Sequence, residues 1–131
     1  MGAATNYLEL KLLDHSLGTA SYTKPTTVYL GLHTTNPGET GSTTGEVSTS
    51  GTAYARQVVT FAAAASGSAA SNATVTFSAA TASWGTIGYI SINDASTAGN
   101  MLYYGAVTTS KAIDTGDTFQ VTSGNLTISL D

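Results

Sequence analysis

Two histidines, with serines and carboxylates, are the residues of this sequence that could do acid–base chemistry. His15 and His33 are the only histidines, and with Asp14 or Asp94 they would support a Ser-His-Asp triad. The sequence has no G-x-S-x-G motif, which presents the nucleophilic serine in one large class of hydrolases. Asp14 and His15 are adjacent on a predicted helix, so their side chains point about 100° apart and do not face one ligand. We therefore predict that both histidines are structural or solvent-facing and that the protein is not an enzyme.

No residue pattern predicts a metal or cofactor site. The chain has no cysteine, which excludes disulfides, thiolate zinc sites and cysteine nucleophiles. Residues 114–117, Asp-Thr-Gly-Asp, resemble part of a calcium loop but lack the downstream Glu of an EF-hand. We expect a turn in which the aspartates bond their own backbone. The other carboxylates are scattered among turns, so a hydrolytic or sugar-binding sandwich is only a third alternative.

Aromatic residues are the remaining candidates for binding. Trp84, Tyr89, Tyr103 and Tyr104 cluster around one predicted hairpin, and alternation along a strand places Tyr103 and Tyr104 on opposite faces. We favour the interpretation that Trp84 and one tyrosine anchor the core. The alternative is a tyrosine-rich outer face that binds a sugar or a protein. With the N-terminal segment included, the candidate interface residues are Tyr7, Leu8, Leu12, Tyr89, Tyr103 and Tyr104.

The first element that would position these residues is a helix over residues 6–17. Asn6 is a suitable N-cap, Glu9 completes a capping box, and Gly18 supplies the left-handed stop. The apolar residues cover more than half of the circumference, which is more than one core-facing stripe requires. Such a helix either lies deep in its own domain or offers a second apolar face to a neighbour.

From residue 27 onward, apolar residues recur at every second position, which is the spacing of a β-strand. Val28, Leu30 and Leu32 alternate on one face, and Gly31 on the other face permits close approach of a second element. Residues 35–52 have no periodicity and are rich in Gly, Ser and Thr, so a long surface loop is expected. About seven strands are predicted, at residues 27–34, 55–61, 73–77, 86–92, 101–107, 118–122 and 125–130.

These strands predict an all-β fold. We expect a single domain over residues 1–131, with one N-terminal α-helix and a β-sandwich or jelly roll over residues 27–130. The strands at residues 86–92 and 101–107 are expected to form a hairpin, and the last two strands a tight C-terminal hairpin. Residues 62–72, an Ala/Ser/Gly tract, are expected to be an adaptable connection.

Composition restricts the partners of this domain. The chain has 4 Lys and Arg against 8 Asp and Glu, a formal net charge of −4, so binding to nucleic acid is not expected. No apolar run approaches the length of a membrane span, and the N-terminus lacks the features of a secretion signal. Only 9% of the residues are charged, so strand edges lack the charges that normally prevent edge-to-edge pairing. We therefore predict self-association into a trimer or a dimer, with no membrane partner.

Several segments carry information beyond composition. Two of them are YLELKLLDH at residues 7–15 and YLGLHTTNPG at residues 29–38. The others are residues 54–61, 77–87, 102–105, 116–118 and 126–128. Together these segments resemble a family of small tailed-bacteriophage virion proteins, described as head-decoration or tail-fibre-like. They span nearly the whole chain, so we expect a complete protein, and they carry no reaction chemistry.

The resemblance implies a virion structural protein without a cofactor, and two roles compete. We expect a capsid decoration (cement) protein that binds the major capsid protein, or another virion protein, on the outer surface of the phage head. Its many non-covalent contacts would stabilise the shell. The alternative is a tail or neck fibre component that takes part in host attachment or glycan binding. Cement is favoured because one compact domain can grip a shell through its helix and its long loop.

Overall fold

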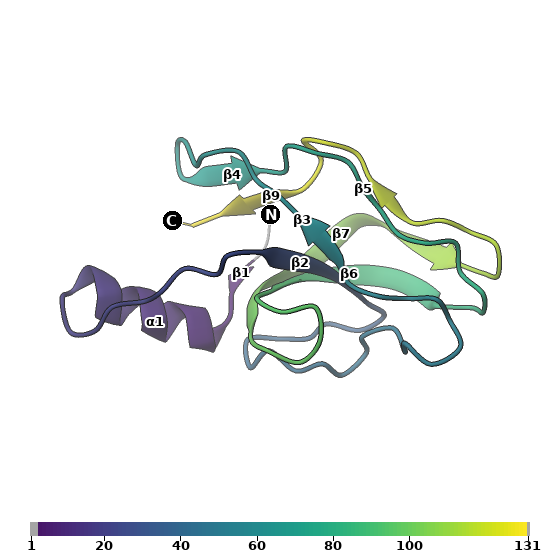
Figure 1. Ribbon diagram of the computed structural model, residues 1–131, viewed down its shortest axis with the longest axis horizontal. Coiled ribbons are helices and arrows are strands. Elements are labelled where there is room, and N and C mark those ends of the chain that lie inside the picture. The colour runs from purple at the N-terminus through teal and green to yellow at the C-terminus, as the bar shows by residue number, and fades with distance from the viewer. Residues whose placement is uncertain (1–2, 131) are drawn as a thin grey trace.

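The main sheet of the protein has five antiparallel strands. In the computed structural model, which describes residues 3–130, their order is β1-β7-β6-β2-β3 (Figure 1). Their bounds are β1 (Ala3–Ala4), β2 (Val28–His33), β3 (Gln57–Val59), β6 (Gly85–Asn93) and β7 (Met101–Ile113). The pairing of β6 with β7 confirms the hairpin predicted for residues 86–92 and 101–107, although β7 extends further, to Ile113.

One face of this sheet supplies a large part of the core. In the register of β2 and β6, Leu30 pairs with Ile92 and Leu32 pairs with Ile90. All four side chains are buried. The residues between them, such as Gly31, face the other side of the sheet, as the two-residue period predicts. This second face is where the polar residues described below lie.

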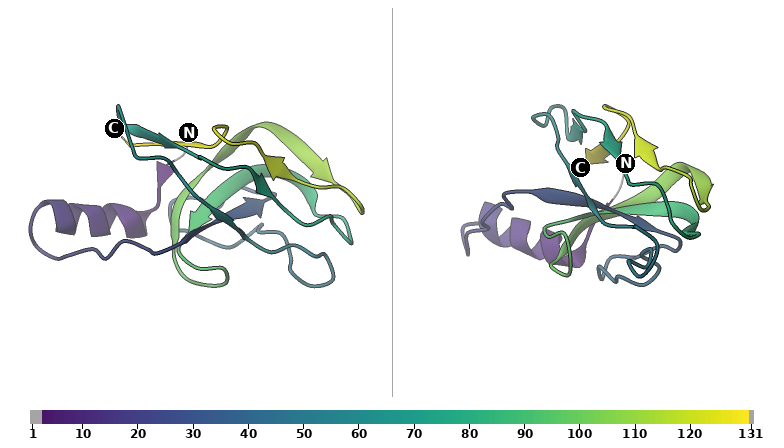
Figure 2. Two further views of the ribbon diagram at one scale, coloured as in Figure 1. Left: turned by 45° about the horizontal axis from the view of Figure 1, so that its top comes forward. Right: turned by 45° about the vertical axis from the view of Figure 1, so that its right-hand side comes forward.

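A second layer packs against the core face of the main sheet (Figure 2). It contains two antiparallel ladders, in which β4 pairs with β9 and β5 pairs with β8. The bounds of these strands are β4 (Ser68–Ala70), β5 (Val75–Thr76), β8 (Gln120–Val121) and β9 (Thr127–Ser129). The all-β class and the single N-terminal helix are confirmed, but the layers are less regular than the two comparable sheets of a jelly roll.

The two ladders are parts of one interrupted ribbon. The Leu130 N–H donates to the Gly67 carbonyl at one end, and the Phe77 N–H donates to the Phe119 carbonyl near the other. The expected C-terminal hairpin is therefore wrong, because β8 and β9 follow one another along the ribbon and pair with distant strands. Gly124, at φ +86°, interrupts the strand without reversing its direction.

A further hairpin joins this ribbon to the main sheet. After β3, Phe61 forms a bridge with Ser71, and a two-residue turn at Ser66 and Gly67 reverses the chain. Both turn residues have positive φ, 53° and 79°, as a type I′ turn requires. The tract at residues 62–72, expected to be an adaptable connection, is thus an ordered hairpin that contains β4.

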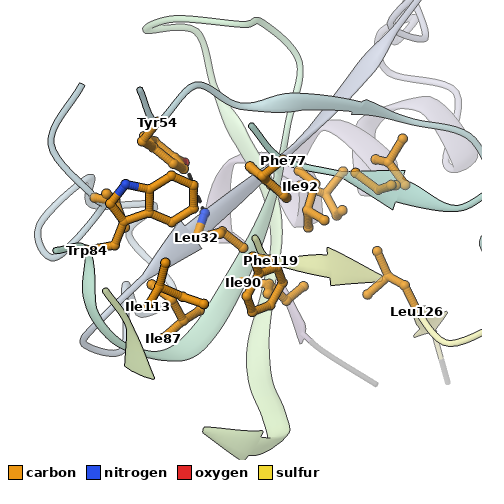
Figure 3. Close-up of a cluster of buried hydrophobic side chains, with 14 of the residues drawn as sticks. Leu32, Tyr54, Phe77, Trp84, Ile87, Ile90, Ile92, Ile113, Phe119 and Leu126 are labelled. Atoms are coloured by element: carbon orange, nitrogen blue, oxygen red, sulfur yellow. Dashed lines mark hydrogen bonds between the residues drawn. The ribbon is translucent and has the colours of Figure 1, made fainter. Parts of the chain in front are cut away.

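Four aromatic side chains lie in the core between the layers (Figure 3). Tyr54 stacks on Phe77 with 6.1 Å between ring centroids, and Trp84 meets Tyr54 edge-on at 5.5 Å. Phe119 meets Phe77 edge-on at 5.8 Å. The Trp84 Nε1–H donates to the Thr52 carbonyl at 2.8 Å, so its polar atom is paired. Trp84 therefore anchors the core as predicted, but the buried tyrosine beside it is Tyr54, which was not among the tyrosines considered. Of those, Tyr103 packs partly buried against the core.

Helix α1 (Asn6–Ser16) is the only helix of the described residues. Its N-cap is Thr5 and not Asn6, which corrects the expected capping box. The Thr5 hydroxyl accepts a hydrogen bond from the Leu8 N–H at 3.4 Å and donates one to the Met101 carbonyl at 2.6 Å. One buried hydroxyl thus caps the helix and ties it to β7, which the exposed Asn6 would not do.

The outer edge of β7 is paired over a short stretch only. Strand β1 covers it at Tyr103 and Tyr104. From Gly105 onward, no strand within residues 3–130 pairs with that edge. Residues 108–112 are all exposed, which is unusual for consecutive residues of a long strand. The backbone groups of this edge are therefore free for another strand, although a register shift against β6 leaves residues 107–110 bulged.

Candidate functional site

The N-terminal segment projects from the body as a finger, defined here as residues 6–25 (Figures 1 and 2). It comprises α1 and the extended segment that returns to β2. At its base, Ala4, Leu8 and Leu102 form a small buried cluster. The partly buried residues that pack on this cluster are Tyr7, Leu12, Tyr22, Val28 and Tyr103. The structure therefore brings four of the six candidate interface residues together, at the place where the finger meets the body.

The other two candidates lie elsewhere on the main sheet. Tyr89 pairs with His33 and Ala106, and Tyr104 pairs with Ser91. Alternation separates Tyr104 from Tyr103, which lies among the residues at the finger base. The opposite orientation of these two tyrosines agrees with the prediction. The six residues do not form one continuous surface.

One side of α1 and its C-cap, Leu17, expose three leucines. Leu10, Leu13 and Leu17 are 65%, 54% and 73% exposed, whereas Leu8 is 3% exposed. We call these three leucines the exposed stripe. The excess of apolar residues around this helix had predicted either a deep position or a second apolar face, and the structure has the second apolar face.

The exposed stripe continues onto the C-terminal strand. Leu10 and Leu13 line an open groove together with Ala3 and Leu130, and Leu130 is itself 48% exposed. Glu9 is the only charged residue that lines this groove among the described residues. An apolar surface of this kind, bordered by polar residues, is typical of a protein–protein contact.

A separate apolar pocket of about 300 Å³ lies between the finger and the second layer. Leu8, Leu12 and Pro25 line it from the finger side, and Phe61 and Ile128 line it from the body. Because this space is not filled by side chains, the finger has few contacts with the second layer. The finger is therefore fastened to the body mainly along β1 and β7.

A buried group of polar side chains lies on the far face of the main sheet from the core. We call it the polar cluster, and its members are His33, Glu46, Arg56, Ser91, Asn93 and the hydroxyl of Tyr54, whose ring lies in the core. Its two central members, His33 and Ser91, are fully buried, and the His33 Nε2 lies 2.9 Å from the Ser91 Oγ. Asn93 donates to the same oxygen at 2.8 Å.

The second half of the polar cluster is an ion pair. Two nitrogens of Arg56 donate to the two oxygens of Glu46, at 2.8 and 2.9 Å, which is the bidentate geometry. The Tyr54 hydroxyl donates to Glu46 at 2.7 Å and accepts from the backbone of Leu32 at 3.0 Å. The remaining Arg56 nitrogen donates to backbone carbonyls at residues 95 and 98, both at 3.0 Å. Arg56 thus ties the long loop to the β6–β7 turn.

The charges and hydrogen bonds of the polar cluster shift the pKa values of its members. Burial lowers the pKa of His33, and the Glu46 carboxylate opposes this only in part. Burial alone would raise the pKa of Glu46, but the hydrogen bonds from Arg56 and Tyr54 outweigh it and lower that pKa. Burial and the Glu46 carboxylate raise the pKa of Tyr54. At neutral pH, a neutral histidine therefore lies near one charged, compensated pair.

The polar cluster depends on a glycine. A Cβ at Gly31 would lie 2.6 Å from the Ser91 Oγ and 3.3 Å from the Glu46 Oε2. The close approach expected at Gly31 is confirmed, and the approaching group is this cluster. Sequence reasoning did not find Glu46 and Arg56. Their signal was the only arginine and one of three glutamates in a chain with few charges.

The long loop at residues 35–52 is more than a surface connection. Glu46 forms a bridge with His33, and Val47 is buried in the core and donates its N–H to the Leu32 carbonyl. The loop therefore protects the edge of β2 where β3 no longer pairs with it. Its middle, at residues 38–45, has the Gly, Ser and Thr composition noted in the sequence, with the threonines exposed and the glycines and Ser42 half-buried.

The sites weighed for catalysis and metals have structural roles here. Asp114 donates its N–H to the Asp117 carboxylate at 2.9 Å, so the expected Asp-rich turn is confirmed. Ser91 and His33 are hydrogen-bonded, but neither side chain has contact with solvent. Within residues 3–130, no three metal-ligating side chains converge, and no helix there is long and apolar enough to cross a membrane.

Comparison with known families places this arrangement in a phage context. A family model described as "Podophage GP4 fiber I protein gp80" matches residues 3–129. The chain belongs to this family. No curated protein matches the sequence. The match spans both the finger and the body, and it confirms the resemblance to tailed-phage virion proteins. Membership of a phage fibre family implies a protein of the virion.

Proposed function

We propose that this protein is a structural component of a phage fibre, located at the tail or neck of the particle and not on the shell of the head. The observation that carries the proposal is the fibre family model, which matches the chain from residue 3 to residue 129. It favours the alternative named above, a fibre component, over the cement role that was expected. The cement role is the competing outcome of the test.

The division into finger and body supports a fibre component. The finger presents apolar side chains to solvent, which suits attachment to another protein. Hydrogen bonds between the loops and the sheet stabilise the body. A stable body suits the part of a fibre component that is exposed to solvent on the particle. The proposed role is binding, and the full burial of the Ser91–His33 pair gives no support for catalysis at that pair.

We also propose that copies of the protein associate along the free edge of β7. The edge from Gly105 to Ile113 carries one charged residue, Lys111, and is rich in threonine and serine. Sedimentation at micromolar concentration is expected to give a dimer or trimer of the 13.2 kDa chain. The variant Thr109→Lys adds a charge to this edge and is expected to give a monomer. A wild-type protein that is only monomeric would contradict this.

The fibre proposal is tested on particles made by a phage whose gene for this protein carries a nonsense codon. We expect such particles to keep their DNA to the same temperature as complete particles but to adsorb poorly to host cells. A quantified gel of complete particles is expected to give a small number of copies. Hundreds of copies, with early DNA loss and normal adsorption in their absence, would establish the cement role instead.

A further inference from the structure

The exposed stripe has the spacing of a helix that binds in a groove. Leu10, Leu13 and Leu17 are separated by three and four residues, so they lie along one side of α1. At about 100° per residue, this side is opposite to Leu8 and Leu12, which face the body. Anchors at positions i, i+3 and i+7 are typical of an amphipathic helix that binds in an apolar groove. Leucines of this exposure have no role in the fold of the isolated chain.

Both flanks of the exposed stripe are acidic. On the same helical wheel, Glu9 lies about 70° to one side of the stripe and Asp14 about 70° to the other. The cation of this helix, Lys11, is turned away from the stripe, and its Nζ lies 5.7 Å from the ring centroid of Tyr7. The C-terminal end of the helix, toward which the stripe runs, carries partial negative charge. A partner surface therefore meets leucines bordered by negative charge.

A second copy of the chain does not complement this surface when the two stripes pack against each other. In that packing, the carboxylates of Glu9 and Asp14 in one copy would face carboxylates of the other copy. This holds whether the two helices run parallel or antiparallel. Like charges at such positions destabilise helix pairs. Of the four basic residues in the chain, Arg56 is buried in its ion pair with Glu46. The acidic flanks likewise disfavour an anionic membrane surface.

We propose that the exposed stripe binds an apolar groove rimmed by lysine or arginine on another protein of the virion. This inference rests on the proposed function, because it assumes that the protein is attached to a particle. The leucines supply most of the affinity, since buried apolar anchors dominate interfaces. Glu9 and Asp14 select the partner and steer it, as charged rims do.

The test is the re-association of purified protein with particles that lack it, followed as a function of concentration and salt. The double variant Leu13→Ser/Leu17→Ser is expected to bind at least 10-fold more weakly than wild type. Val58→Ser, which removes a side chain that is 52% exposed on β3, is its control and should bind as wild type does. Unchanged thermal unfolding of both variants would establish that the fold is intact.

The charge part of the proposal has its own variant. Glu9→Gln/Asp14→Asn is expected to weaken re-association about 3- to 10-fold at low salt, and the difference should vanish near 0.5 M salt because charges are then screened. Asp114→Asn/Asp117→Asn removes the same charge at the turn after β7 and is the matched control. Equal or tighter binding of the Glu9 and Asp14 variant would overturn the basic rim.

Two further measurements decide between occupants of the exposed stripe. Sedimentation that gives an oligomer for wild type and a monomer for the leucine variant would assign the stripe to a second copy and overturn the proposal. Binding of wild type, but not of the leucine variant, to phosphatidylcholine vesicles would assign it to lipid and also overturn it. If wild type re-associates and the leucine variant does so equally well, the inference fails while the fibre proposal stands. If wild type does not re-associate at all, the proposed function fails.

Discussion

In the body, the side chains of Glu46, in the long loop, and Arg56 are 14% and 5% exposed, while in the finger three leucines are more than half exposed. The two regions thus reverse the usual distribution of charge and apolar surface. In the body, the buried charge is compensated within the chain, by Glu46, Arg56 and Tyr54. In the finger, nothing among the described residues covers the leucines. The charges of the body are therefore compensated within the chain, whereas the leucines of the finger are exposed.

The largest effect is expected when the compensated charge of the body is broken. Arg56→Met leaves the Glu46 carboxylate buried and removes the donor to two backbone carbonyls. The free energy of unfolding should fall by about 3–5 kcal/mol, measured by urea denaturation. Lys111→Met removes an exposed cation from β7 and is expected to change it by less than about 0.5 kcal/mol. A loss below about 1 kcal/mol for Arg56→Met would mean that the ion pair does not hold the loops.

The second largest effect is expected when leucines on the two sides of α1 are truncated, because only the inner side should contribute to stability. Leu8→Ala empties a site that is 3% exposed at the base of the finger, and is expected to cost about 3 kcal/mol. Leu17→Ala truncates a side chain that is 73% exposed, so thermal and urea unfolding should stay within about 0.5 kcal/mol of wild type. Equal losses for the two variants would mean that the exposed stripe is covered in solution.

The tight approach of the polar cluster to the sheet is tested at Gly31. Gly31→Ala places a Cβ 2.6 Å from the Ser91 Oγ, and the free energy of unfolding should fall by about 1–3 kcal/mol. At Gly88, a Cβ would lie 3.4 Å from its nearest neighbour, the Ser110 Oγ. Gly88→Ala is therefore the matched control and should not destabilise the protein. If Gly31→Ala is equally neutral, the cluster can move away from the sheet.

The smallest expected effect is a pH dependence that belongs to the body alone. The pKa of His33 is lower in the folded protein, so between that value and the unfolded value, about 6.5, the unfolded chain binds more protons. The free energy of unfolding is therefore unaffected by His33 above about pH 7. It falls as the pH drops below that value, by at most about 1.4 kcal/mol per pH unit. Urea denaturation between pH 7 and pH 5 measures this slope.

His33→Gln, which cannot titrate, is expected to flatten this slope. His15→Gln removes the exposed histidine of the finger and serves as the control. A slope that is unchanged in the His33 variant and lost in the His15 variant would assign the pH response to the finger. The window stays above pH 5 because the pKa of Glu46 is itself lowered by its hydrogen bonds, so its contribution is lost only at more acid pH.

The sequence was informative where a local pattern determines the structure. The period of two at Val28, Leu30 and Leu32 and the helical pattern before Gly18 predicted β2 and α1 correctly. The long-range pairing of β8 and β9 was not predictable in this way, because Ser123 and Gly124 have the composition of a hairpin turn. The choice of pairing partner for a strand depends on contacts between side chains that are distant in the sequence, such as Phe77 and Phe119.

The same limit applies to the candidate site. The excess of leucines around α1 indicated two apolar faces, but only the structure assigns Leu8 to the inside and Leu10 to the outside. The polar cluster joins residues from β2, the long loop and β6, and no spacing along the chain connects Glu46 with Arg56 and Ser91. A buried pair of charges has no periodic signature, since it depends on a fold that is already in place.

The link between Thr5 and the carbonyl of Met101 determines when the finger can take up its position. The two residues are 96 positions apart, and β1 pairs with the same strand. On a ribosome, α1 therefore emerges early but has no strand to dock on until most of the chain has been synthesised. During that interval all of its leucines are exposed, those of the inner face included. Premature contacts can form during this interval, and slow synthesis between α1 and residue 101 would lengthen it.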